Sequence, residues 1–136
     1  MTRWMLLLGS NLADDTRLHA AVERLMALGN GAWLTSIEHH AADGHGAGMY
    51  YNALVMLDCE ASREALDAGL KRIEADLGRR RDGSGEVAID IDIVASWQDD
   101  AWRADAHALA KGEFTRATLP RLLRGAHLDV AVPPSA

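Results

Sequence analysis

The sequence is poor in cysteine and proline, with one cysteine and three prolines among 136 residues. The single cysteine, Cys59, cannot close an internal disulfide, and no spacing typical of a Cys/His zinc site occurs. Long hydrophobic runs are also missing: the apolar run at 4–8 is too short for a signal peptide core or a membrane span. We therefore expect a protein of the reducing cytoplasm, with no membrane partner.

Positive charge is scarce as well, since the formal net charge is −6 at pH 7. A negative chain argues against non-specific nucleic-acid binding, which needs a broad basic surface. It leaves room for a local cationic pocket, because 12 of the 14 basic residues are arginines, which suit bidentate contacts to phosphate. The length and the 49% hydrophobic content predict one globular domain spanning residues 1–136.

Hydrophobic periodicity predicts strands at 4–8, 33–37, 49–59 and 87–94, with helices at 15–28 and between a Ser62 cap and a Gly78 stop. The order β-α-β-β-α-β predicts a ferredoxin-like α+β sandwich, an antiparallel sheet with helices on one face and the other face free for a ligand. Residues 39–48 read as a loop rich in histidine and glycine. Beyond the last strand we expect a turn at 99–100, a short helix near 119–123 and a loose tail at 130–136.

Two aspartates interrupt the apolar strand at 87–94. Because strand side chains alternate between faces, Asp90 and Asp92 share one face while Ile89, Ile91 and Ile93 point into the core. Two neighbouring carboxylates repel each other, and a shared divalent cation with a preference for oxygen ligands, such as Mg²⁺, removes that conflict. The alternative is a solvent-exposed sheet face with no ligand. The aspartates alone do not decide between these two interpretations.

A run of three arginines, 79–81, lies in a glycine-rich loop shortly before the aspartates. Such a run can simply stabilise the C-terminus of the preceding helix. Together with a metal, however, loop arginines provide what a polyphosphate needs, since they neutralise its non-bridging oxygens. The sequence has no P-loop motif, so any nucleotide must be held in another way.

Four segments, LLLGSNL at 6–12, YYNALVML at 50–57, IEADLGRRR at 73–81 and IDIDIV at 89–94, occur in the order and approximate spacing of one family. The sequence resembles the 6-hydroxymethyl-7,8-dihydropterin pyrophosphokinases of folate biosynthesis over about residues 4–95. The resemblance implies transfer of diphosphate from ATP to the hydroxymethyl group of the pterin, with two Mg²⁺ ions. It implies small-molecule partners only, and a monomer or homodimer.

The resemblance also implies roles for particular residues. The Mg²⁺ ligands would be Asp90 and Asp92, which would act in catalysis together with the phosphate-contacting Arg79 and Arg81. The pterin would be bound by Tyr50, Asn52 and Phe114. The nucleotide would be bound by Glu74, Arg79, Arg81, Arg103 and His107.

The chain departs from the family pattern mainly on the ATP side. Where the family carries Arg-Trp and Pro-Arg before the aspartates, this chain has a shorter segment, with Glu86 and Val87 near the place of an expected arginine. The histidine-rich loop, with His39, His40 and His45, would be a flap over the site rather than a metal centre. These departures support a second hypothesis, a catalytically weakened paralogue that binds a pterin or related molecule, or a regulatory or interaction module.

Overall fold

The computed structural model describes residues 1–41, 48–78 and 85–133. Their secondary structure comprises β1 (Thr2–Ser10), α1 (Thr16–Leu25), β2 (Asn30–Trp33), β3 (Glu38–Ala41), β4 (Met49–Cys59), α2 (Arg63–Asp76), β5 (Asp90–Gln98), β6 (Ala101–Ala104), α3 (Ala106–Ala110), α4 (Thr118–Gly125) and β7 (Val130–Ala131). The strands form one open sheet in the order β2-β4-β1-β5-β6-β7, with β3 also pairing with β4. All pairings are antiparallel except that between β6 and β7. The predicted α+β class is confirmed.

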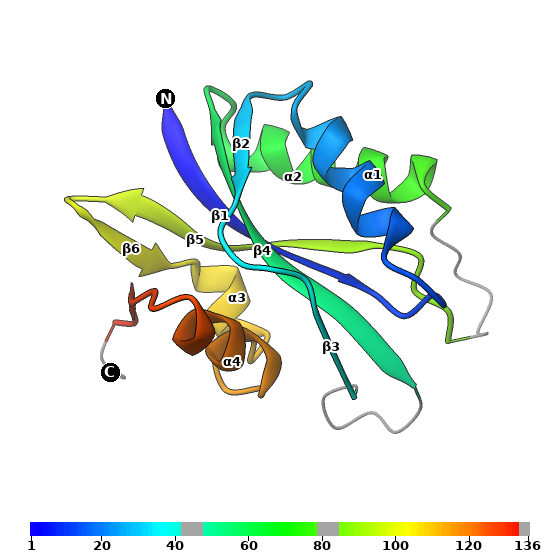
Figure 1. The fold of residues 1–136 in the computed structure, drawn as a ribbon. Helices are drawn as coiled ribbons and strands as arrows, with labels where there is room; N and C mark the ends of the chain where they lie inside the picture. Colours follow the sequence, from blue (N-terminus) through cyan, green and yellow to red (C-terminus); the bar gives the residue numbers. More distant parts are fainter. Residues whose placement is uncertain (42–47, 79–84, 134–136) are drawn as a thin grey trace.

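The central strand β1 is buried on both faces, which explains its unbroken apolar run. Leu6 and Leu8 pack with α1 and α2 on what we call the first face of the sheet. Met5 and Leu7 pack on the opposite, second face, beneath α3 and α4. Figure 1 shows the two pairs of helices on opposite sides of the sheet. The C-terminal helices thus cover part of the second face, which was predicted to carry no helices.

Helix α2 begins and ends as its sequence predicts. The Ser62 hydroxyl accepts a hydrogen bond of 3.1 Å from the Ala65 N–H, which is the expected cap. Gly78 follows the helix with φ +104°, a left-handed conformation that glycine adopts without strain. The isoleucines of the aspartate strand are also where predicted, since Ile89, Ile91 and Ile93 are all 5% exposed or less.

The edge of the sheet beside β4 differs from the prediction. The alternation at 33–37 suggested one strand, but β2 ends at Trp33 and β3 starts at Glu38. The loop predicted at 39–48 is wrong for its first three residues, which pair with β4 in β3. Residues 42–47 lie outside the described part of the chain. Short polar edge strands carry a weak periodic signal, so their bounds are hard to place from sequence.

The C-terminal part is more ordered than predicted. The Asp99-Asp100 turn is confirmed, with φ of +51° and +59°. The turn brings the rings of Trp97 and Trp102 edge to face, with their centroids 5.4 Å apart. The predicted short helix corresponds to α4. The loose tail is wrong at its start, because Val130–Ala131 forms β7 alongside β6. No helix in the described ranges is long and apolar enough to span a membrane.

Candidate active site

The outer edge of β5 is where the candidate site begins. Strand β6 pairs with β5 only from Ala95 onward, so among the described residues no strand covers the edge at 90–94. Helix α2 covers it instead: the buried carboxylate of Glu74 accepts a hydrogen bond of 2.8 Å from the Ile91 N–H. A buried backbone N–H without an acceptor is costly, so this bond fixes α2 against the strand.

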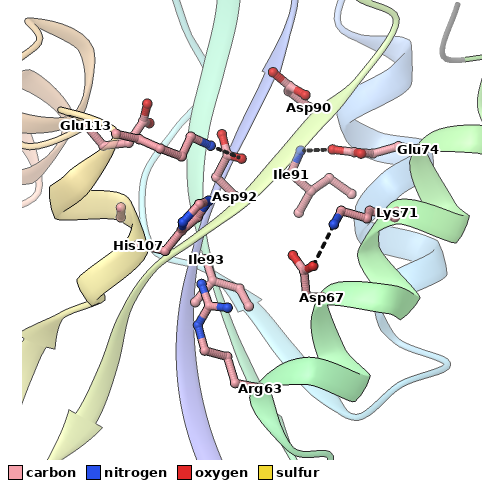
Figure 2. Close-up of a pocket in the computed structure, with 12 residues that line it drawn as sticks. Arg63, Asp67, Lys71, Glu74, Asp90, Ile91, Asp92, Ile93, His107 and Glu113 are labelled. Atoms are coloured by element: carbon pink, nitrogen blue, oxygen red, sulfur yellow. Dashed lines mark hydrogen bonds and ion pairs between the residues drawn. The ribbon is translucent and has the colours of Figure 1, made fainter.

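A pocket of about 440 Å³ lies along this edge, between α2 on one side and α3 with its following loop on the other. Figure 2 shows the side chains of α2 facing those of Asp92 and His107 across the strand. Its lining residues are Arg63, Asp67, Lys71, Glu74, Asp90, Ile91, Asp92, Ile93, His107, Ala108, Lys111 and Glu113. Most of them are charged, so the pocket suits a polar or ionic ligand.

Asp90 and Asp92 are half-buried and both line the pocket. The Lys111 ammonium donates a hydrogen bond of 3.3 Å to Oδ1 of Asp92. The aspartates are therefore part of a concave charged surface, and they are not the freely solvated side of an amphipathic strand. Of the two interpretations left open by the sequence, this placement favours a ligand site.

Glu113 is a pocket residue that the sequence did not reveal. Its side chain is buried, and its carboxylate accepts a hydrogen bond of 2.7 Å from Nη1 of Arg116. Burial raises its pKa, and the charges of Asp92 and Asp90 raise it further. Glu113 follows α3 in a stretch without periodicity, so no local pattern marks it as a neighbour of the aspartates.

One ion pair ties the two walls of the pocket together. Arg63, at the start of α2, donates two hydrogen bonds of 2.7 and 2.8 Å to the carboxylate of Asp105, which also caps α3 through the Ala108 N–H. Burial acts to raise the pKa of Asp105, but the bonds from Arg63 and Ala108 outweigh it, and the pKa is lowered. The pair thus sets the separation of α2 and α3.

A second group of predicted site residues lies on the second face, beside the aspartates. In the sheet register Gly9 pairs with Asn52 on one side and with Asp90 on the other, so these three residues form one row across β4, β1 and β5. Paired residues of adjacent strands project to the same face. Asn52 and Asp90 therefore lie on one face with only a glycine between them.

The glycine in this row leaves room for its neighbours. A Cβ added to Gly9 would lie 2.8 Å from Nδ2 of Asn52, which donates a hydrogen bond of 3.2 Å to the Leu8 carbonyl. Tyr50, two residues from Asn52 on the same strand, also borders Gly9. Burial raises the pKa of the Tyr50 hydroxyl, and the nearby charge of Asp90 raises it further. The structure thus brings Tyr50, Asn52 and Asp90 together.

Asn11 binds the segment before β5 through both its side chain and its backbone. Its side chain accepts a hydrogen bond of 2.6 Å from the Val87 N–H and donates one of 2.8 Å to the Gly85 carbonyl. Its own backbone N–H donates to the Val87 carbonyl at 3.0 Å. The Gly-Ser-Asn segment after β1 therefore holds the chain that leads into Asp90.

The remaining predicted residues lie in separate places. His107 lies in the pocket wall, and Phe114 packs against the apolar core of the second face. Arg103 is exposed on β6, where its Nε donates to the Gln98 carbonyl at 3.2 Å, and it is not among the pocket-lining residues. Arg79 and Arg81 lie outside the described residues.

The donor set fits Mg²⁺ only together with ligands from outside the protein. Asp90 and Asp92 offer hard carboxylate oxygens in a polar pocket, which is the usual protein contribution to an Mg²⁺ site completed by water and phosphate. Within the described ranges no group of three or more His, Cys, Asp or Glu side chains is arranged to hold a metal ion. A metal site here would therefore need further ligands, from water or from a bound molecule.

No curated protein matches the chain. The family model of 7,8-dihydro-6-hydroxymethylpterin-pyrophosphokinase matches residues 5–129, nearly the whole sequence. The match includes most of β1, Asn52, the aspartate strand and the segment that supplies His107 and Glu113. The chain belongs to the 7,8-dihydro-6-hydroxymethylpterin-pyrophosphokinase family.

Proposed function

We propose that this chain transfers the diphosphate group of ATP to the hydroxymethyl oxygen of 6-hydroxymethyl-7,8-dihydropterin. The family uses ATP and Mg²⁺. The observation that carries the proposal for this chain is the row Asn52–Gly9–Asp90 on one sheet face. Two strand spacings separate Asn52 from Asp90, roughly 10 Å, which accommodates a bicyclic heterocycle between an amide and a metal-binding carboxylate.

The pterin would lie beside the Asn52 amide, which occupies the space left by the missing side chain of Gly9. Asn52 can present a donor and an acceptor together to the amide-like edge of the heterocycle. Tyr50 also borders Gly9, and Phe114 is proposed to stack on the ring. This arrangement would direct the hydroxymethyl group toward Asp90 and the pocket beyond it.

The nucleotide would occupy the pocket between α2 and α3. Asp90 and Asp92 would hold Mg²⁺, which would neutralise part of the phosphate charge. The hydroxymethyl oxygen attacks the β-phosphorus, loses its proton and displaces AMP. His107 and Glu74 would hold the nucleotide from opposite walls, with Arg79, Arg81 and Arg103 proposed as phosphate or nucleotide contacts. Holding both substrates in line accounts for much of the expected acceleration.

Two features of the pocket favour the second candidate function, a weakened paralogue that binds a pterin or serves regulation. The described pocket cations each have a carboxylate partner: Arg63 with Asp105, Lys71 with Asp67, and Lys111 with Asp92. The buried carboxylate of Glu113 adds negative charge beside the aspartates. Both features weaken the attraction for a polyphosphate relative to a pocket of unpaired cations.

The decisive test combines catalysis and binding in one protein preparation. Purified protein with ATP, Mg²⁺ and 6-hydroxymethyl-7,8-dihydropterin is expected to release AMP. Asp90→Asn and Asp92→Asn should each lower the rate on the order of 100-fold, because each removes a metal-binding charge. Asp100→Asn, the same substitution in the β5–β6 turn, serves as the matched control and should leave the rate unchanged.

The outcomes separate the two candidates. Background AMP release with calorimetric binding of the pterin would reject the transferase and support the weakened paralogue. Background AMP release without pterin binding would support a regulatory or interaction module. Full activity in both aspartate variants would reject the proposed metal ligands while leaving the reaction in place.

A further inference from the structure

Lys111 is in contact with one of the proposed metal ligands. Its ammonium lies 3.3 Å from Oδ1 of Asp92, and both side chains are partly exposed to the pocket. In the free protein the position beside Asp92 is therefore occupied by a cation that the chain itself supplies.

The backbone of Lys111 is held firmly while its side chain has room to move. Its N–H donates to the His107 carbonyl at 3.0 Å, and its own carbonyl accepts a hydrogen bond of 3.1 Å from Nη2 of Arg116. The same Arg116 guanidinium binds Glu113 through Nη1. The N–H and the carbonyl of Lys111 are thus both held by hydrogen bonds. Its flexible four-carbon side chain remains free to change its partner.

Local charge gives a reason for such a contact. Asp90, Asp92 and Glu113 bring three carboxylates near one another, and Lys111 and Arg116 oppose them with two cations. Arg116 is already paired with Glu113. Among the described residues, Lys111 is in direct contact with Asp92 and reduces the repulsion there, a task that a divalent ion would perform more strongly.

We propose that Lys111 occupies the metal position at Asp92 in the free protein. When the nucleotide arrives with its metal, the ammonium leaves Asp92 and transfers its contact to the diphosphate oxygens. Lys111 is then a positioning residue that discourages metal binding without nucleotide and favours the complete metal–nucleotide complex. The transfer to the nucleotide rests on the proposed function. The competition with metal at Asp92 does not.

Manganese alone tests the competition between Lys111 and a metal ion at Asp92. Free Mn²⁺ is followed by electron paramagnetic resonance, with no nucleotide or pterin present. Lys111→Met should bind Mn²⁺ about tenfold more tightly than the unchanged protein, because an ammonium and a divalent ion about 5 Å apart repel by about that factor in a water-like dielectric. Lys71→Met is the matched control: Lys71 lines the same pocket but pairs with Asp67, so its loss should leave Mn²⁺ affinity nearly unchanged.

Calorimetry with α,β-methylene-ATP and Mn²⁺ tests the transfer of the Lys111 contact to the nucleotide. Lys111→Met should bind this analogue several-fold more weakly, and Lys111→Arg should restore most of the loss. Unchanged or weaker Mn²⁺ binding by Lys111→Met, or no Mn²⁺ binding by either protein, would overturn the competition. Tighter Mn²⁺ binding with undiminished analogue binding would overturn the transfer. Failure of the wild-type protein to release AMP would reject the proposed function but would leave the Mn²⁺ comparison intact.

Discussion

Gly9→Ala tests the arrangement of the proposed pterin surface with a single added carbon. The new Cβ would lie 2.8 Å from Nδ2 of Asn52, whereas ordinary contacts of this kind start at 3.4 Å, so the amide must shift by about 0.6 Å. The amide donates to the Leu8 carbonyl at 3.2 Å, and the same shift would stretch that hydrogen bond beyond useful length.

The change in stability should be small because two effects oppose each other. Loss of the hydrogen bond costs about 1 kcal/mol. Replacing glycine by alanine in a strand recovers about 0.5–1 kcal/mol of conformational free energy. The free energy of unfolding should therefore stay within about 1 kcal/mol of the starting value, as measured by urea denaturation.

Pterin binding should respond much more strongly. A displaced amide loses at least one well-aligned hydrogen bond to the heterocycle, about 1.4 kcal/mol, which corresponds to about tenfold weaker binding in calorimetry. Gly69→Ala in α2 is the matched control, because its Cβ would meet Leu28 at an ordinary 3.5 Å. That variant should gain stability and bind the pterin normally. Unchanged pterin affinity in a folded Gly9→Ala protein would refute the placement of the pterin beside Asn52.

Three further predictions concern stability, measured by urea denaturation. Because the Asp105 pKa is lowered in the folded state, its stabilisation is present above its unfolded pKa of about 3.9 and is lost as pH falls through the folded pKa. Asp105→Asn should thus cost about 2 kcal/mol at pH 7 and progressively less below pH about 3.9; a cost independent of pH would contradict this. Glu74→Leu removes the acceptor of the Ile91 N–H and should cost about 2 kcal/mol, more than Glu74→Gln, which keeps a carbonyl oxygen; equal costs would argue against the hydrogen bond. Asp100→Gly should raise the unfolding free energy by about 0.5 kcal/mol, because φ is +59° there; a loss of stability would count against strain in the turn.

The parts of the fold that sequence predicts best are those with strong local periodicity. In α2 the 3.6-residue spacing of Leu66, Leu70 and Ile73 and the Ser62 cap identify the helix nearly to the residue. In β5 the two-residue alternation separates the isoleucines from the aspartates, and both groups lie on the predicted faces. Where periodicity is short or absent, as in the five residues of α3 and the two of β7, the sequence has too few residues to show a pattern.

The site follows the same division. Asp90 and Asp92 stand out because their spacing in one strand is itself the signal. The opposite wall of the pocket is formed by Lys111 and Glu113, which reach the aspartates only because the chain returns over the second face after β6. No local feature of that segment reports this long-range packing. The same holds for Asn11, whose side chain binds Val87, 76 residues away in the sequence.

The charged side chains around the pocket are arranged largely as ion pairs. Three ion pairs lie along its walls: Arg63 with Asp105, Lys71 with Asp67, and Lys111 with Asp92. A pocket lined by unpaired charges of one sign would disfavour folding through repulsion, and these ion pairs reduce that repulsion. The consequence for binding is an exchange: an incoming metal and polyphosphate must replace ion pairs already present. A ligand that brings both a cation and an anion could replace the partners on both sides at once, so the proposed metal–nucleotide complex would be favoured over either component alone.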